Sequence, residues 1–259
     1  MELKLIQAEI DLADSFVEKG CTELNWNSEN ITQFMEDFRA PVECLFSRII
    51  QIQTNFSEIQ EIMTKWAKAP LFVRKDNRKD TTLCVDEREE RTNARYEEMQ
   101  KVAVRIHELL EENLQLFRME GKMNENEWPN YVKYCDDIVY KNLLHTVGVS
   151  IAYISDNMDP ENVFPPLFES RLELEIPNLI FIPSLDANDK KGFYQLLHSL
   201  VNDILFMSTL IPRLDKEAEQ TYEELIHNEA DIKEMKQEIL LSVDKALEEA
   251  SQFCRDFER

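Results

Sequence analysis

The four histidines are the residues of this chain that could bind a metal ion. His107 precedes Glu111 by four positions, and His227 precedes Asp231 by the same spacing; the other two are His145 and His198. On a helix this spacing puts both side chains on one face, which would supply half of a metal site. The same spacing is typical of a stabilising pair on a solvated helix face. Because no third ligand with metal spacing is visible, we expect no metal site.

Acidic and hydroxyl side chains that could act as an acid, a base or a nucleophile also lack a usable arrangement. Asp136 and Asp137 are adjacent, and adjacent residues of a helix point in different directions. We therefore interpret them as part of a solvated face and not as a general acid–base pair. Ser199 and Ser208 have no base partner at a readable spacing, so nucleophilic catalysis has no specific support.

Motifs for binding phosphate or for hydrolysis are absent from the sequence. GxxxxGK[ST], GxGxxG, HExxH, CxxC and GxSxG do not occur, and 4 glycines are too few for a glycine-rich loop. Trp66, Tyr134 and the apolar stripe beginning at Phe193 could line a pocket, but at helical spacing such residues are more often core. The sequence predicts no catalytic, cofactor-binding or metal-binding residue, and no cofactor.

Long helices account for most of the chain. Apolar residues recur at i, i+3 and i+4, the period of an amphipathic helix. Gly20 and Gly121 are predicted stops, Ser28 is a predicted N-cap, and Pro129 fits a first turn. We expect helices from Leu3 to Gly20, over 31–66, 86–120, 128–154 and 193–211, and in one long helix over 214–259.

One short segment departs from helical periodicity. Leu172, Leu174 and Ile176 alternate with charged residues, as in a half-buried strand, and Pro177-Asn178 separates them from a second apolar run. This pattern predicts a β-hairpin at about 168–183. Our hypothesis is that its three apolar side chains lock one helical bundle against the next.

The predicted fold class is therefore all-α, with elongated antiparallel helical bundles and one small β-hairpin insertion. We expect a helical bundle over 1–160, the hairpin insertion over 161–186, and a helix pair over 187–259 that continues into a further bundle. Both ends of the chain fall within helical pattern, which we interpret as a fragment of a longer polypeptide.

Charge and cysteine usage limit the partners and the location. The formal net charge is −22, and a surface this acidic repels nucleic acid, anionic lipid and the acidic surface of tubulin. We therefore expect no nucleic acid, no membrane and no direct tubulin contact, and a basic patch is the favoured partner surface. Five scattered cysteines without CxxC indicate a reducing compartment. With no signal peptide and no apolar run of about 18 residues, the chain is expected to be soluble and cytoplasmic.

Four stretches together resemble the stem, or tail, of axonemal dynein heavy chains. Each motif is short, but their order and spacing match over nearly the whole chain, and the charged features look more like outer-arm heavy chains than the cytoplasmic one. The stretches are Leu24-Asn25-Trp26-Asn27-Ser28, Trp66-Ala67-Lys68-Ala69-Pro70-Leu71-Phe72, the acidic run Asp86–Arg91 with Arg95-Tyr96 and Ile106–Asn113, and Pro183-Ser184-Leu185-Asp186 with Ile211-Pro212-Arg213-Leu214.

The resemblance implies a mechanical role. In this family the stem is a series of helical bundles that transmits force between the motor ring and the attachment of the arm in the ciliary or flagellar axoneme. ATP hydrolysis belongs to the ring, so the resemblance implies no catalytic residue here. It implies other heavy chains and intermediate and light chains as partners.

Two other classes remain open. A generic spectrin-like or coiled-coil scaffold would have helices of one repeated length and no strand pair. A helical enzyme or metal-binding bundle would have carboxylates and histidines facing inward from neighbouring helices, whereas the polar residues here mostly fall off the apolar stripes.

Overall fold

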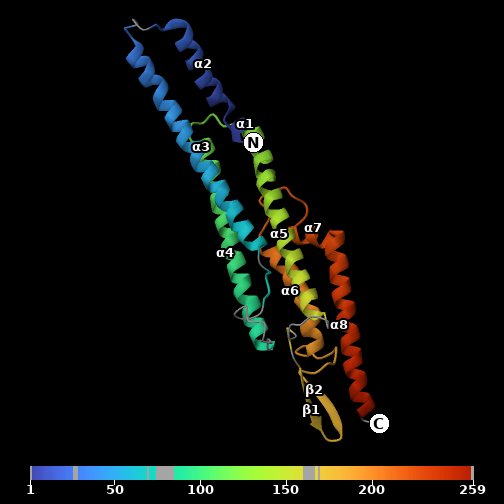
Figure 1. Cartoon of the computed structure of the whole chain (residues 1–259). Coiled ribbons are helices and arrows are strands. Elements are labelled where there is room, and N and C mark those ends of the chain that lie inside the picture. Colours follow the sequence, from blue (N-terminus) through green and yellow to red (C-terminus); the bar gives the residue numbers. More distant parts are fainter. Residues whose placement is uncertain are drawn as a thin grey trace. The chain divides into compact units, whose positions relative to one another are not determined.

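The structure is a computed structural model of the chain that describes residues 2–25, 29–68, 70–73, 85–159, 167–168 and 170–257. Helices dominate these residues, and the strands found among them form one antiparallel pair (Figure 1). The elements are α1 (Glu2–Leu5), α2 (Gln7–Glu23), α3 (Ile31–Ala67), α4 (Val85–Arg118), η2 (Glu125–Glu127), α5 (Trp128–Met158), β1 (Arg171–Glu175), β2 (Asn178–Ile182), α6 (Phe193–Met207), η3 (Ser208–Leu210), α7 (Tyr222–Asn228) and α8 (Ala230–Phe257). An all-α fold with a small β-hairpin is confirmed.

Residues of three sequence predictions lie outside the described part of the chain. They are Trp26–Ser28 with the predicted cap, Ala69 of the second family motif, and residues 161–166 of the predicted hairpin insertion.

The end of α2 differs from the prediction. Gly20 does not stop the helix, which continues to Glu23. A Cβ atom at Gly20 would lie only 3.1 Å from the ring of Phe34 on α3, so the glycine allows a close approach of two helices and does not end one. Gly121 does follow a helix end: its φ is 67°, and its amide donates to the carbonyl of Arg118 at 2.8 Å.

The predicted single helix over 214–259 is also wrong. Residues 214–221 are not helical, and α7 and α8 follow as separate helices. Thr221 begins α7 with a capping box, in which its hydroxyl accepts from the Glu224 amide and the Glu224 carboxylate accepts from the Thr221 amide. Glu229, which is extended, separates α7 from α8. The apolar pattern is sparse before Leu225, and capping decides where the helix starts.

The hairpin forms where it was predicted, with Leu172 opposite Phe181 and Leu174 opposite Leu179. Its predicted burial is wrong. Leu172, Leu174 and Ile176 are 44%, 57% and 85% exposed, so β1 is not a half-buried strand, and these side chains do not lock bundles together. The side of the hairpin that contacts a helix is β2, which lies against α8.

Two compact units are formed from separated segments of the chain. The first unit contains Met1–Met63, Val104–Val139 and Leu214–Glu217, and the second contains Thr64–Ala103, Tyr140–Arg213 and Ala218–Arg259. The division at 1–160, 161–186 and 187–259 stays a prediction.

The core of the first unit is made by α3, α4 and α5, with α1 and η2 beside it. Its fully buried side chains include Leu5, Ile59, Ile106, Phe117 and Tyr131. The rings of Phe117 and Tyr131 pack edge to face with centroids 5.4 Å apart. Burying such side chains contributes about 1.5–3 kcal/mol each.

The second unit is built around α6. Its helix presents a wide apolar stripe that contacts α7 and α8, and the buried members of that stripe are Leu196, Leu200, Val201, Ile204, Leu205 and Met207. Val243 and Leu247 on α8 and Val147 and Ile151 on α5 complete this core. Among the described residues, no helix combines the length and apolar character needed to cross a membrane.

Candidate functional site: buried polar links between helices

The histidines lie on four different helices, one each on α4, α5, α6 and α7. Within the described ranges, no group of three or more His, Cys, Asp or Glu side chains could hold a metal ion. His198 packs between two side chains. Its ring stacks on that of Tyr194 with the ring centroids 4.2 Å apart, and its Nε2 lies 2.8 Å from the Asp244 carboxylate. This pair joins α6 to α8.

Asp136 corrects the sequence interpretation. It is 1% exposed, so it does not belong to a solvated face, whereas Asp137 does. Its carboxylate accepts a hydrogen bond from the Leu214 amide at 2.9 Å and lies 3.5 Å from the Asp215 amide. It thereby satisfies backbone donors of the segment that connects η3 to α7, where no helix supplies partners. Asp136 therefore holds a distant chain segment in place.

Asn113, the last residue of the third family motif, joins three helices. It is completely buried. Its side-chain oxygen accepts from the Asn55 amide on α3 at 2.9 Å, and its nitrogen donates to the Tyr131 hydroxyl on α5 at 2.9 Å. Burial raises the pKa of Tyr131 far above its ordinary value, so its hydroxyl stays protonated. Because hydrogen bonds need defined geometry, this network fixes the registration of α3, α4 and α5.

A buried ion pair joins α2 to α3. Arg48 and Glu9 have side chains that are 6% and 8% exposed, and the guanidinium pairs with the carboxylate. Arg48 also donates to the carbonyl of Leu116 on α4 at 3.1 Å. Arg48, which lies on α3, therefore links α2 and α4 within the first unit. Removing two charges from water is costly, so such a pair contributes more to the choice of one packing arrangement than to net stability.

A second set of charged contacts lies nearer the surface of the first unit. Arg105 on α4 makes two hydrogen bonds to Glu58 on α3, at 2.7 and 3.0 Å. The hydrogen bond from Arg105 lowers the pKa of Glu58 below its ordinary value. Together with the Asn55–Asn113 and Arg48–Leu116 contacts, this contact shows that α3 and α4 run antiparallel. As the residue number increases along α3, the number of its partner on α4 decreases.

In the second unit the partly buried Arg88 joins α4 to α6. Arg88 pairs with the Asp203 carboxylate and donates to the Ser199 hydroxyl at 2.7 Å. Burial raises the pKa of Asp203 despite the opposing effect of Arg88, and burial together with the Asp203 charge raises the pKa of Tyr96 to about 12. The Ser199 hydroxyl is thus a hydrogen-bond partner of Arg88. The Ser208 hydroxyl donates to the carbonyl of Leu205 at 2.6 Å.

Further contacts in the second unit anchor the segment that follows α3. The Leu71 amide donates to the Ser150 hydroxyl at 2.8 Å, and Ser150 donates to the carbonyl of Thr146 at 2.6 Å. Trp66 lies beneath the guanidinium of Arg95, which is 5.6 Å from the ring centroid. Trp66 is only partly buried, and Tyr134 is 38% exposed, so neither is the fully buried core residue that the sequence predicted.

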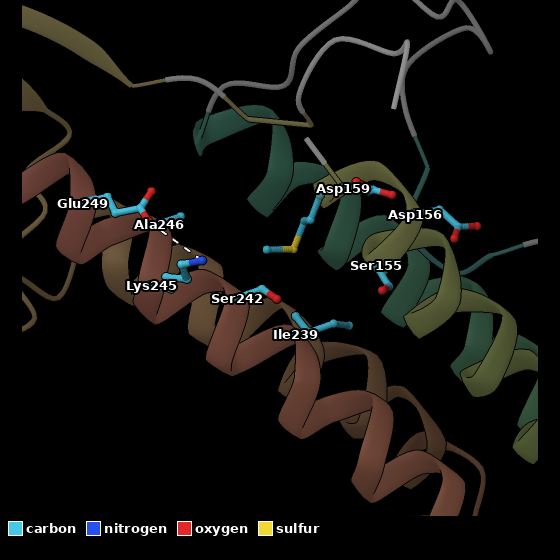
Figure 2. A pocket seen from close by; sticks show the side chains of 9 residues that line it. Ser155, Asp156, Asp159, Ile239, Ser242, Lys245, Ala246 and Glu249 are labelled. Atoms are coloured by element: carbon cyan, nitrogen blue, oxygen red, sulfur yellow. Dashed lines mark ion pairs between the residues drawn. The ribbon is translucent and has the colours of Figure 1, made fainter. Parts of the chain in front are cut away.

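The second unit also has a solvent-filled groove between two of its helices. A groove of about 520 Å³ lies between the end of α5 and α8 (Figure 2), and its lining comes from Ser155, Asp156, Met158, Asp159, Ile239, Ser242, Lys245, Ala246 and Glu249. Lys245 pairs with Glu249 at 4.0 Å. The two serines have no histidine among these neighbours to act as a base. The lining is that of a solvated groove between helices.

Cys135 is buried in the first unit, and burial raises the pKa of its thiol to about 12. The thiolate is the reactive form of a cysteine, and burial disfavours it here. Its position supports the interpretation of cysteines as small apolar residues.

Comparison with known proteins identifies the family. No family model matches the sequence. Among curated proteins, the ciliary dynein beta chain of Tripneustes gratilla is 32% identical over 259 residues, and dynein axonemal heavy chain 17 of Mus musculus is 34% identical over 259 residues. Each match covers 100% of this chain. The chain belongs to the axonemal dynein heavy chains. It spans about 6% of the length of these relatives.

The family resemblance drawn from four short motifs is therefore confirmed. An outer-arm character also fits, since the flagellar outer-arm dynein beta chain of Chlamydomonas reinhardtii is 24% identical over 239 residues, covering 86% of this chain and 5% of that protein. Axonemal dynein heavy chains are ciliary and flagellar proteins, so the axoneme is the location of this chain.

Proposed function

We propose that this chain is a non-catalytic structural segment of a dynein heavy-chain stem, which transmits force between the motor ring and the attachment of the arm. The observation that carries the proposal is the completely buried Asn113, whose hydrogen bonds join α3, α4 and α5. Apolar contacts alone tolerate sliding of one helix along another. A buried polar network opposes sliding, because its hydrogen bonds are satisfied in only one register of the helices. A segment that carries load needs this resistance.

The parent heavy chain is, under this proposal, an ATP-driven microtubule motor, and the segment itself is not an enzyme. The polar side chains that the sequence offered for chemistry are used in packing: Asp136 holds backbone amides, Ser199 accepts from Arg88, and His198 pairs with Asp244. We propose other heavy chains and intermediate and light chains of the arm as partners, and no tubulin contact, because the chain carries a charge of −22.

The generic scaffold is the weaker alternative. It requires helices of one repeated length and no strand pair. The helices α2 to α8 range from 7 to 37 residues, and the strand pair is present. Homology over the whole chain to axonemal dynein heavy chains also favours the motor context.

The test is a full-length heavy chain that carries Asn113→Ala in this segment. We expect microtubule-stimulated ATP hydrolysis to stay unchanged while the force that the motor sustains in an optical trap falls. A matched control is Gln115→Ala, which changes an exposed amide two positions away. Unchanged force at unchanged ATP hydrolysis would contradict a force-transmitting role.

A further inference from the structure

A groove between α2 and the first half of α3 leaves aromatic side chains without a complete cover. Its volume is about 400 Å³, and its lining includes Phe16, Val17, Cys21, Phe34, Met35 and Phe38. The ring of Phe16 lies 6.3 Å from that of Phe34 and 6.1 Å from that of Phe38. The two helices run side by side here (Figure 1), and their contact is built on these rings.

Two helices alone do not bury this seam. In α2 the only buried residue is Glu9, and in α3 no residue before Arg48 is buried. The polar contacts of α3 with α4 are made at Arg48, Asn55 and Glu58. Before Arg48, the Cys44 thiol donates at 3.9 Å to Glu120, which lies just after α4. Val17 and Met35, which line the groove, are 52% and 54% exposed. A continuous apolar groove of this kind is typical of a surface that receives an amphipathic helix.

The charge of the surface around the groove indicates which side chains the incoming helix should have beside its apolar face. Residues 11–45 contain eight carboxylates and two basic side chains. The two basic side chains, Lys19 and Arg39, are already paired with Glu23 and Glu43. Glu18 and Glu36, which directly follow the groove residues Val17 and Met35, are exposed. A second copy of this chain would bring carboxylates against carboxylates, whereas a helix with lysines or arginines beside its apolar stripe is complementary.

We propose that the groove between α2 and α3 binds a basic amphipathic helix of another subunit of the arm. That the helix comes from another subunit of the arm rests on the proposed stem function. Apolar side chains of the incoming helix would pack on Phe16, Phe34 and Phe38, and its cationic side chains would lie over Glu18 and Glu36. The third helix would complete a bundle at a place where the chain provides only two helices.

Cys21 supplies the readout, because it lines the groove and is exposed. The probe is a synthetic 20-residue helical peptide (roughly the 30 Å length of a groove-binding helix) with leucines on one face and lysines beside them. Alkylation of Cys21 by iodoacetamide is followed by mass spectrometry with and without the peptide. Cys44, which is exposed on α3 and does not line this groove, is the internal control.

The peptide is expected to slow alkylation of Cys21 about tenfold when it fills nine-tenths of the grooves, by mass action. Cys44 should react at its original rate, and added salt should reduce the protection. Val17→Asp and Met35→Asp, which change exposed side chains, should abolish protection without changing the melting temperature. Because these variants leave the buried Asn113 network intact, a negative result here is distinguishable from failure of the force experiment.

Three results would overturn the proposal. The first is equal protection by a peptide of scrambled order or by one with glutamate in place of lysine. The second is protection of Cys21 without peptide, accompanied by a dimer in sedimentation, which would make the occupant a second copy. The third is protection of Cys21 in a longer heavy-chain polypeptide without added peptide, which would place the occupant within the same chain.

Discussion

The carboxylate of Asp136 on α5 holds the backbone amide of Leu214, 78 positions along the chain, at 2.9 Å. The carboxylate is 1% exposed and Leu214 is 4% exposed. This contact explains why Leu214–Glu217 belongs to the first unit although α6 and α7 on either side belong to the second. A single buried acceptor thus determines where the non-helical connection between η3 and α7 lies.

Asp136→Ala should destabilise the chain by about 2–3 kcal/mol, because it leaves a buried backbone donor without its charged acceptor. Asp137→Ala, on the exposed side of the same helix turn, should change stability by less than about 0.5 kcal/mol. Urea unfolding followed by circular dichroism measures both. Equal effects of the two substitutions would show that Asp136 is not an anchor.

Replacement of Asn113 by alanine should cost about 2–4 kcal/mol, since it leaves the Asn55 side chain and the Tyr131 hydroxyl without their shared partner. Hydrogen exchange should speed up in α3, α4 and α5 together, because one network joins them. Gln115→Ala is the matched control. Faster exchange in α4 alone would mean that the three helices are not coupled through this residue.

Much of the helical part was predictable from the sequence because apolar stripes run through α3, α4 and α5 without interruption. The hairpin was predictable from its change of period at Leu172. The role of Gly20 was not predictable, because it depends on the ring of Phe34, which comes close to Gly20 only in the folded chain. The exposure of Leu174 was not predictable either, since alternation specifies two faces of a strand but not what covers them.

The polar links were harder to predict than the helices. Asp136 had a usable signal: it stands four residues after Val132 and three before Val139, both buried, and therefore lies on their helix face. Its partner was invisible, because a backbone amide 78 positions away leaves no local pattern. Asn113 and Arg48 likewise lie on apolar faces, and a polar residue in such a position is a candidate for a contact between helices.

For the buried Arg48–Glu9 pair, replacing one charged side chain should destabilise the chain more than replacing both. Glu9→Gln or Arg48→Met alone should cost about 3–5 kcal/mol, because each leaves the other charge buried without its partner. The double substitution Glu9→Leu with Arg48→Met should recover much of that loss. A double-mutant cycle from urea unfolding measures the coupling free energy. Additive effects would indicate that the two side chains act independently.

The Glu58–Arg105 contact predicts a pH dependence with a definite direction. The pKa of Glu58 is lowered in the folded chain, so the folded state binds fewer protons than the unfolded state as this carboxyl titrates. Its contribution to stability is present above the unfolded pKa of about 4.3 and is lost as the pH falls through the folded pKa.

Arg105→Gln should therefore be less stable than the unchanged chain at pH 7, and the difference should shrink as the pH falls below the pKa of Glu58. Urea midpoints measured from pH 7 to pH 3 test this. Lys101→Gln removes an exposed charge from the same helix and serves as the control. A difference that stays constant with pH would argue against the pair.

The hairpin gives the last prediction, which reverses the expectation drawn from its sequence. Leu174 is 57% exposed and faces Leu179 across the strand pair, so Leu174→Asp removes one cross-strand contact worth less than about 1 kcal/mol. The melting temperature should therefore stay within about 4 °C of the original. Leu200→Asp, which places a charge on the buried face of α6, should abolish cooperative melting. Should Leu174→Asp instead cost several kcal/mol, the hairpin face would have to be covered in solution, because an exposed leucine has too few contacts to lose that much.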